Sequence, residues 1–414
     1  MRRVYFLPLG CYRNQVDSEK YAAWLKNKGF KIVSSFKQAD ILIINTCAFI
    51  AAAREESVEA IKEALLLKRK KKIRKLIVAG CLVKLYWREL LEYTSLIDAL
   101  WGLDIVNNHP SRFFLKTSHV AYLKISEGCS FRCSYCRIPQ IKGTLRSRTL
   151  KSILREVEWL DGHGVRELVI IGQDTTSWGK DIYRQKDFAF LLRQIVKNIS
   201  QIKWIRIMYA HPLSLSEPII KTIAAIDKIC NYIDLPLQHI NDRILRLMNR
   251  RTSRHYLERL LRFIRKNIPD VSLRTTFIVG FPTETDVEFE ELVSFVKDTE
   301  FKNLSAFIYS PEAGTPAYNL PAVESRKKRE RFHYLMRVQR DISRRLNEKL
   351  VGKELGFIID DSNAESSWGR SYYDAYEIDG AAYIDRGFSV GKIVKGKVVG
   401  ASAYDIIVET RRRN

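Results

Sequence analysis

Short apolar runs alternate with longer amphipathic stretches along the first quarter of the chain. Alternation of this kind is typical of parallel strands that are joined by crossover helices. The predicted strands are residues 4–9, 41–44 and 76–79, and the predicted helices are residues 16–28 and 52–67. We therefore predict an N-terminal α/β domain with a parallel sheet.

The same alternation continues through the middle of the chain, where apolar runs recur with amphipathic helical stretches between them. This pattern predicts a β/α repeat, open or closed as a partial TIM-like barrel, with its ligand-binding loops after the strands. The helical stretches include residues 153–162 and 188–199. The predicted strands are residues 120–125, 168–171, 204–209, 232–235, 273–279 and 304–309.

In the last quarter of the chain, a basic helical stretch and short apolar runs replace the alternation of strands and helices. Residues 324–350 are strongly basic, and their apolar positions keep a helical spacing, so we predict a helix that joins two domains. Short alternating runs separated by glycines follow and predict a small antiparallel β-barrel. These runs are residues 355–359, 382–384, 393–399 and 404–408. The predicted domains are residues 1–110, 115–345 and 350–414, in a chain of 414 residues.

Charge is distributed unevenly between these predicted domains. The chain has 70 Lys and Arg against 47 Asp and Glu, a net charge of +23. Such an excess favours an anionic partner such as a ribonucleoprotein, although a generally basic protein would also show it. Residues 351–414 carry nine basic and ten acidic side chains, a net of −1, and three of the nine are Arg411, Arg412 and Arg413. An RNA-binding barrel is expected to be basic, so an acidic one favours a cationic protein partner.

The seven cysteines are an odd number in a chain of ordinary composition, 46% hydrophobic and 28% charged. A disulfide framework is therefore not expected, and metal or redox chemistry is favoured. No stretch approaches the roughly 18 apolar residues of a membrane span. We expect a cytoplasmic protein.

Three cysteines, Cys129, Cys133 and Cys136, follow the first predicted strand of the middle domain within one short loop. Iron–sulfur clusters are held by Cys thiolates in such runs. Three ligands on a four-iron cluster would leave one iron open. Tyr135 places an aromatic ring beside the last cysteine, where it can stack on a purine.

Other polar residues of the strand-end loops are weaker candidates. Gln173 and Asp174 are predicted to bind the amino and ribose groups of a nucleoside-like cofactor, and Arg274 to bind a carboxylate. Each of them also fits a capping or turn role. His211 and His239 are expected to be structural, and Cys230 is expected to be a core residue.

A second cysteine set is spread over the N-terminal domain. Cys11, Cys47 and Cys81 each follow one of its predicted strands. Ligand sites in parallel sheets form at the carboxyl ends of strands, so the three residues can converge. Each cysteine alone also fits a small buried core residue. Zinc suits three thiolates as well, and spacing does not separate it from iron.

These phrases together resemble a known family. The loop from Cys129 to Cys136 is similar to the cluster loop of radical S-adenosylmethionine enzymes. Phrases around the other cysteine set resemble the methylthiotransferase domain, and the similarity covers nearly the whole chain. The N-terminal phrases are Gly10-Cys11-Tyr-Arg-Asn-Gln-Val-Asp17-Ser-Glu19, Asn45-Thr46-Cys47-Ala-Phe-Ile50 and Gly80-Cys81-Leu82.

Three further phrases resemble most the subgroup that modifies an aspartate of the twelfth protein of the small ribosomal subunit. They are Gly172-Gln-Asp-Thr-Thr-Ser-Trp-Gly179, Leu235-Pro-Leu-Gln-His-Ile-Asn-Asp242 and Gly369-Arg-Ser-Tyr-Tyr-Asp374. The chain departs from the family at a few positions without losing a cysteine. Tyr12-Arg13 replaces Pro-Lys, Lys84-Leu85 replaces Gln-Arg, and Thr283 stands where Gly is frequent.

The resemblance implies two 4Fe-4S clusters and S-adenosyl-L-methionine as cofactors. One cluster would be held by Cys129, Cys133 and Cys136 and would bind S-adenosylmethionine; the other would be held by Cys11, Cys47 and Cys81 and would carry the methylated sulfur. Reduced flavodoxin or ferredoxin would supply the electron. The implied activity is insertion of a methylthio group at the β-carbon of the aspartate. Because cofactors carry this chemistry, no catalytic side chain is predicted.

The implied fold is a partial radical S-adenosylmethionine barrel that is followed by a TRAM barrel. The interpretation requires the two cysteine sets to face each other across a shared cavity. Two alternatives stay open. One is the related methylthiotransferase of isopentenyladenosine in tRNA, and the other is a zinc-stabilised ribonucleoprotein-binding protein without catalysis.

Overall fold

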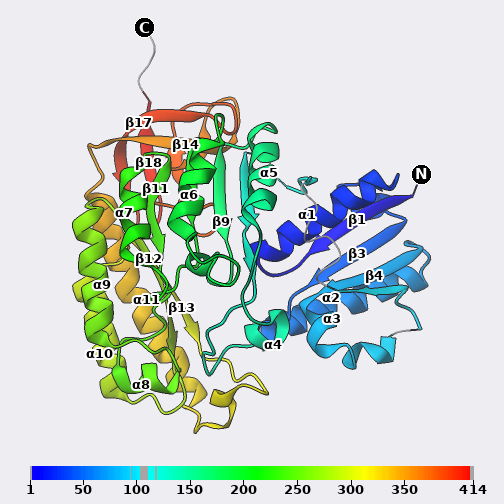
Figure 1. Ribbon diagram of the computed structural model, residues 1–414, viewed down its shortest axis with the longest axis horizontal. Helices are drawn as coiled ribbons and strands as arrows, with labels where there is room; N and C mark the ends of the chain where they lie inside the picture. Colours follow the sequence, from blue (N-terminus) through cyan, green and yellow to red (C-terminus); the bar gives the residue numbers. More distant parts are fainter. Residues whose placement is uncertain (1, 94, 103–110, 117–118, 411–414) are drawn as a thin grey trace.

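Three units follow one another along the chain in the computed structural model (Figure 1), which describes residues 2–93, 95–102, 111–116 and 119–410. The predicted boundary at residue 110 and the tail residues Arg411, Arg412 and Arg413 lie outside the described residues. Within the described part, no helix combines the length and the apolar character that a membrane crossing requires.

The N-terminal unit is a five-stranded parallel sheet with the strand order β2-β1-β3-β4-β5. Its predicted strands and helices are confirmed, whereas the two edge strands are too short to leave an apolar run. The strands are β1 (Arg3–Pro8), β2 (Lys31–Ile32), β3 (Ile41–Thr46), β4 (Lys75–Gly80) and β5 (Ala99–Trp101). The helices are α1 (Tyr12–Asn27), α2 (Ala51–Arg69) and α3 (Cys81–Tyr86), with 3-10 turns η1 (Phe36–Gln38) and η2 (Glu89–Tyr93).

The central unit is a six-stranded sheet in which every strand pair is parallel, in the order β13-β12-β11-β10-β9-β6. Each strand pairs with its neighbour in the chain, as in a (β/α) barrel, but β6 and β13 do not pair. The predicted partial barrel is therefore confirmed. The strands are β6 (Val120–Lys124), β9 (Glu167–Ile171), β10 (Trp204–Ile207), β11 (Ile229–Asp234), β12 (Ser272–Val279) and β13 (Asn303–Ile308).

Helices cover the outer face of this sheet and bury its apolar side chains in one large core. Side-chain caps fix where several of them begin, because Thr149, Asp187, Ser253 and Thr285 each accept a hydrogen bond from the first turn. The helices are α4 (Ile138–Lys142), α5 (Leu150–Asp161), α6 (Phe188–Lys197), α7 (Glu217–Ala225), α8 (Asp242–Leu247), α9 (Arg254–Asn267) and α10 (Asp286–Thr299). The remaining elements are β7 (Ser126–Glu127), β8 (Arg146–Ser147), η3 (Thr175–Ser177) and η4 (Pro316–Asn319).

The predicted joining helix is α11 (Ser325–Glu348), and it leads into a closed barrel with the order β14-β15-β16-β18-β17. The predicted small barrel is confirmed. Its strands pair antiparallel except for β16 and β18, which are parallel. The strands are β14 (Glu354–Ser362), β15 (Ser367–Arg370), β16 (Ala382–Ile384), β17 (Ile393–Ala401) and β18 (Ile406–Glu409).

The phrase from Gly369 to Asp374 forms the joint between this barrel and the central sheet. Arg370 is buried, and its Nη2 donates to Glu167 of β9 at 2.6 Å. Arg206 of β10 donates to the same carboxylate at 2.6 Å and to the Tyr372 carbonyl at 2.8 Å. A phrase that resembles one subgroup thus serves to dock two domains and does not line the cysteine sites.

Candidate functional site

The three cysteines of the N-terminal domain lie at the carboxyl edge of its sheet, as predicted. Cys11 precedes α1 directly after β1, Cys47 follows β3, and Cys81 begins α3 after β4. Asn14 ties the first two strand ends together, because its Nδ2 donates to the carbonyls of Leu9 and Thr46, both at 2.9 Å. The topology therefore brings together three residues that are far apart in the sequence.

Gly10 permits the close approach of two of these strand ends. Its φ is +79°, and a Cβ at this position would lie 2.5 Å from the Cβ and 2.7 Å from the Sγ of Cys47. Any side chain at position 10 would displace Cys47 or strain the backbone. The glycine thus sets the spacing between the first and second cysteines.

The loop of Cys129, Cys133 and Cys136 is held by the segment that follows α8. The backbone N–H of Ser134 donates to the Met248 carbonyl at 3.0 Å, and the Asn249 Nδ2 donates to the Arg132 carbonyl at 2.7 Å. Arg250 is buried, and its Nη1 lies 3.8 Å from the Cys133 Sγ. Sequence analysis missed this support, because nothing local in the sequence marks Arg250 as a partner of a loop more than a hundred residues away.

Burial controls the protonation of the cysteine thiols. Burial, with a smaller effect of neighbouring cysteines, raises the pKa of Cys136 to about 12 and that of Cys81 to about 12. Burial also raises the pKa of Cys11, but the Arg13 guanidinium, the Lys142 ammonium and nearby backbone N–H groups together outweigh it, so that this pKa is lowered overall. Thiols with such high pKa values are poor nucleophiles by themselves and lose their protons to a bound metal.

The chemistry of the donor sets suits iron–sulfur clusters, because each set offers three soft thiolates and iron–sulfur clusters are held by Cys thiolates. In the ranges that the structure describes, no three or more His, Cys, Asp or Glu side chains are arranged to hold one metal ion.

A cavity of about 260 Å³ lies between the N-terminal domain and the central sheet. Phe49 and Ile50, which follow Cys47 closely, form one wall, and Tyr135, between Cys133 and Cys136, forms another. The ends of β12 and β13 complete it with Phe307 and other residues. One cavity is therefore lined by sequence neighbours of both cysteine sets, and the requirement that the two sets face each other across it stays a prediction.

Buried charges hold the two cysteine-bearing domains together. Lys124 of β6 donates to Asp17 of α1 and to Glu127. Lys142 of α4 adds a second ammonium, 3.4 Å from Glu127 and 4.0 Å from Asp17. Removing any member would leave an uncompensated buried charge, so this cluster fixes how the two domains meet.

The residues predicted to bind the cofactor differ in whether their side chains already have partners within the protein. Tyr135 packs edge-on against Phe281, with ring centroids 6.5 Å apart, and lines the cavity. The buried amide atoms of Gln173 have no hydrogen-bond partner within the described chain, so this side chain is ready for a ligand. Asp174 is buried and already accepts hydrogen bonds from three hydroxyls, which belong to Thr176, Ser177 and Ser214.

Arg274 is paired within the protein. Its Nη1 lies 3.4 Å from Asp234, and its Nε lies 3.2 Å from Asp379, which comes from the C-terminal unit. Its binding of a cofactor carboxylate stays a prediction. Cys230 is a buried core residue, as expected, and His239 is buried against Glu284 at 3.0 Å. His211 stacks on Phe131 of the cysteine loop, with ring centroids 3.7 Å apart.

The departures from the family pattern make contacts of their own. Tyr12 stacks on Tyr122 of β6 with ring centroids 4.1 Å apart, and Arg13 donates to the Gly172 carbonyl at 2.7 Å. Thr283 has a φ of +67°, a conformation that favours glycine, and Arg243 donates to its hydroxyl and carbonyl. These substitutions adjust the domain contacts and leave the cysteines in place.

Comparison with known proteins agrees with this architecture. Three family models match the chain: the radical SAM superfamily over residues 123–296, uncharacterized protein family UPF0004 over residues 3–102, and the TRAM domain over residues 351–410. Ribosomal protein uS12 methylthiotransferase RimO of Thermoanaerobacter sp. (strain X514) is 41% identical, with 99% of this chain and 100% of that protein covered. The chain belongs to the ribosomal protein uS12 methylthiotransferase family.

A second member of this family, from Clostridioides difficile (strain 630), is 39% identical over 98% of both chains. Among solved structures, the radical S-adenosylmethionine methyltransferase TsrM from Kitasatospora setae, with cobalamin and a [4Fe-4S] cluster bound, has a TM-score of 0.55. It is 14% identical, and the match covers 77% of each chain. At that identity the likeness establishes the fold and not the activity.

Proposed function

We propose that this protein inserts a methylthio group at the β-carbon of one aspartate of ribosomal protein uS12. Full-length similarity to relatives that carry this activity in their name supports the proposal. The structural observation that carries it is the cavity lined by Tyr135, between two cysteines of one set, and by Phe49 and Ile50, which follow Cys47 of the other set. A reaction that activates a carbon and delivers a sulfur to it needs both centres at one substrate atom.

The chain's cofactors are those of its family, 4Fe-4S clusters and S-adenosylmethionine. In our proposal Cys129, Cys133 and Cys136 hold the cluster that binds S-adenosylmethionine, and Cys11, Cys47 and Cys81 hold the second cluster. When bound, these groups supply the radical that activates an inert C–H bond and the sulfur and methyl group that replace the hydrogen.

In this proposal the protein's own side chains bind S-adenosylmethionine and shield the reaction site. We assign Tyr135 and the unpartnered amide of Gln173 to S-adenosylmethionine, with Asp174 and Arg274 as further candidates. Phe49 and Phe307 give this cavity apolar walls that are exposed in the structure, and a bound substrate would cover them and shield the reacting atoms from water. No side chain is needed as an acid or base.

The acidic composition of the C-terminal barrel favours a protein substrate over tRNA only where the acidic side chains face solvent. Three of the acidic residues of the C-terminal barrel turn inward: Asp360 pairs with Arg370, Asp374 lies 3.6 Å from Lys302, and Asp379 pairs with Arg274. The outer surface of the barrel is therefore less acidic than its composition, and the similarity to uS12 enzymes carries more weight. Reduced flavodoxin or ferredoxin as the electron donor, a cytoplasmic location and domains at residues 1–110, 115–345 and 350–414 complete the proposal.

The mass of uS12 tests the proposal directly. In a strain that lacks this gene, uS12 should lose the mass of one methylthio group in place of hydrogen, and the gene supplied on a plasmid should restore it. Methylthiolated nucleosides of tRNA should stay unchanged. A loss in the tRNA pool with unchanged uS12 would assign the tRNA activity instead. No change in either pool would refute both activities.

Gly10→Ala should lower the occupancy of the N-terminal cysteine set. The new Cβ collides with Cys47, so we expect iron and acid-labile sulfide to fall toward half of the wild-type content. Gly29→Ala is the matched control, because its φ of +84° is equally unusual but no atom lies within 4 Å of the added Cβ. Equal iron loss in both variants would show that backbone strain, and not the contact with Cys47, is responsible.

A further inference from the structure

We propose that the enzyme binds RNA along the exposed face of α11 and in the groove between this helix and the C-terminal barrel. Basic residues recur three and four positions apart along the helix, so they lie on one face. Each of them is exposed to solvent. We call this set the arginine stripe: Arg326, Arg329, His333, Arg337, Arg340 and Arg344.

The middle of the arginine stripe is not neutralised by the protein. Arg326 lies 3.7 Å from Glu324 and 3.8 Å from Glu330, and Arg344 lies 3.3 Å from Asp341. Across the described ranges, no carboxylate lies within ion-pair distance of Arg329, Arg337 or Arg340, in contrast to these outer members. Like charges on successive turns repel one another, and a polyanion along the face relieves the repulsion.

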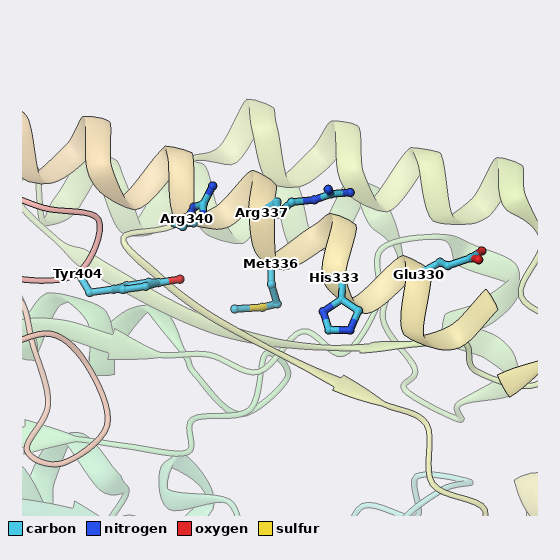
Figure 2. Close-up of a pocket in the computed structure, with 6 residues that line it drawn as sticks. All are labelled: Glu330, His333, Met336, Arg337, Arg340 and Tyr404. Carbon is cyan, nitrogen blue, oxygen red and sulfur yellow. The ribbon is translucent and has the colours of Figure 1, made fainter. Parts of the chain in front are cut away.

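The groove beside the stripe has a volume of about 470 Å³ and combines charge with an aromatic ring (Figure 2). Tyr404, from the turn between β17 and β18, is 50% exposed and points toward α11. Met336 extends from the helix toward this ring, His333 and Glu330 lie farther along the helix, and Arg337 and Arg340 complete the lining. An aromatic ring beside arginines suits a nucleotide, whose base stacks while its phosphates meet the guanidinium groups. An acidic peptide would use the charges but not the ring.

The first turn of the same helix contacts the wall of the cavity that Tyr135 lines. Lys328, in the first turn of α11, has its Nζ 5.3 Å from the ring centroid of Tyr309, which lines that cavity. Arg337 lies nine residues further along the helix, a distance of about 14 Å at 1.5 Å per residue. RNA on the stripe would therefore run along the outer face of the helix whose inner face, at Lys328, contacts the wall of this cavity. The inference rests on the proposed function and deepens it: uS12 is modified while it is in contact with ribosomal RNA.

Binding to a labelled oligoadenylate tests the surface without any turnover. Arg337→Ala with Arg340→Ala should weaken binding about tenfold and reduce the slope of log affinity against log salt by about 1 to 2. Tyr404→Ala should weaken binding by a similar factor with little change in that slope. The matched control is Arg345→Ala with Lys349→Ala on the same helix, since both side chains already face Glu300, at 3.0 and 3.9 Å.

The same variants then separate this inference from the proposed function. With small ribosomal subunits as substrate, the Arg337/Arg340 variant should modify uS12 several-fold more slowly, whereas the rate with free uS12 should match that of the wild type. Equal weakening of oligoadenylate binding in the Arg345/Lys349 control would overturn the inference, because binding would then follow overall charge. A wild-type affinity for polyglutamate that matches oligoadenylate, together with a silent Tyr404→Ala, would assign the groove to an acidic protein segment. Wild-type protein that binds RNA but modifies neither form of uS12 would refute the proposed function alone.

Discussion

Alanine at Cys11, Cys47 and Cys81 together should abolish methylthiolation of uS12 while reductive cleavage of S-adenosylmethionine continues. The three residues belong to the N-terminal sheet, and the loop of Cys129 is held separately by the segment after α8. Loss of one set should therefore leave the other intact. We expect iron to fall from roughly eight to roughly four atoms per chain, with acid-labile sulfide falling in parallel. Anaerobic metal analysis and the yield of 5′-deoxyadenosine measure the two effects.

The complementary variant and a control complete this experiment. Alanine at Cys129, Cys133 and Cys136 should also halve the iron but abolish cleavage of S-adenosylmethionine. Cys230→Ala should change neither quantity, because this cysteine is a buried core residue that belongs to neither set. Unchanged iron in the first triple variant would refute the assignment of the N-terminal set. Zinc without labile sulfide in the wild type would refute both assignments.

The strands that precede the cysteines could be predicted because a strand buried on both faces leaves a continuous apolar run in the sequence. β3 and β9 are buried on both faces and read as continuous apolar runs, whose ends mark the ligand loops. The short strands β2, β5 and β15 were missed, because two to four residues leave no period to detect. Strands could thus be predicted where the apolar run in the sequence is long.

Contacts between domains could not be predicted in the same way. The buried partners of Lys124 include Asp17, which is 107 positions away, and the sequence shows only two ordinary charged residues. Arg274 shows the same limit: its position near the strand ends suggests a ligand, and nothing local in the sequence indicates its ion pair with Asp379 of another domain. Such pairs depend on how whole units pack, so local patterns carry no trace of them.

Arg370→Met should destabilise the protein by about 3–5 kcal/mol at neutral pH, because it leaves buried Glu167 and nearby Asp360 with fewer partners. Burial alone would raise the pKa of Glu167, but Arg370 and Arg206 outweigh it and lower this pKa to about 2 from an ordinary value of 4.5. A carboxyl whose pKa is depressed in the folded state stabilises the fold above its unfolded pKa, and this contribution is lost as the pH falls through the folded pKa. The difference in unfolding free energy between wild type and variant should therefore be largest above pH 4.5 and shrink toward pH 2.

Chemical denaturation across that pH window, with limited proteolysis at the joint before β14, measures this effect. Lys395→Met is the matched control, because this side chain is exposed on the same barrel and should change stability by no more than about 0.5 kcal/mol. A loss that stays constant from neutral to acidic pH would mean that Arg370 acts through packing and not through its ion pairs. Arg370 belongs to the segment from Gly369 to Asp374 that resembles one subgroup of enzymes. If the prediction holds, its ion pairs would set the position of the C-terminal barrel relative to the central sheet. They would thereby also set the position of the groove between this barrel and α11.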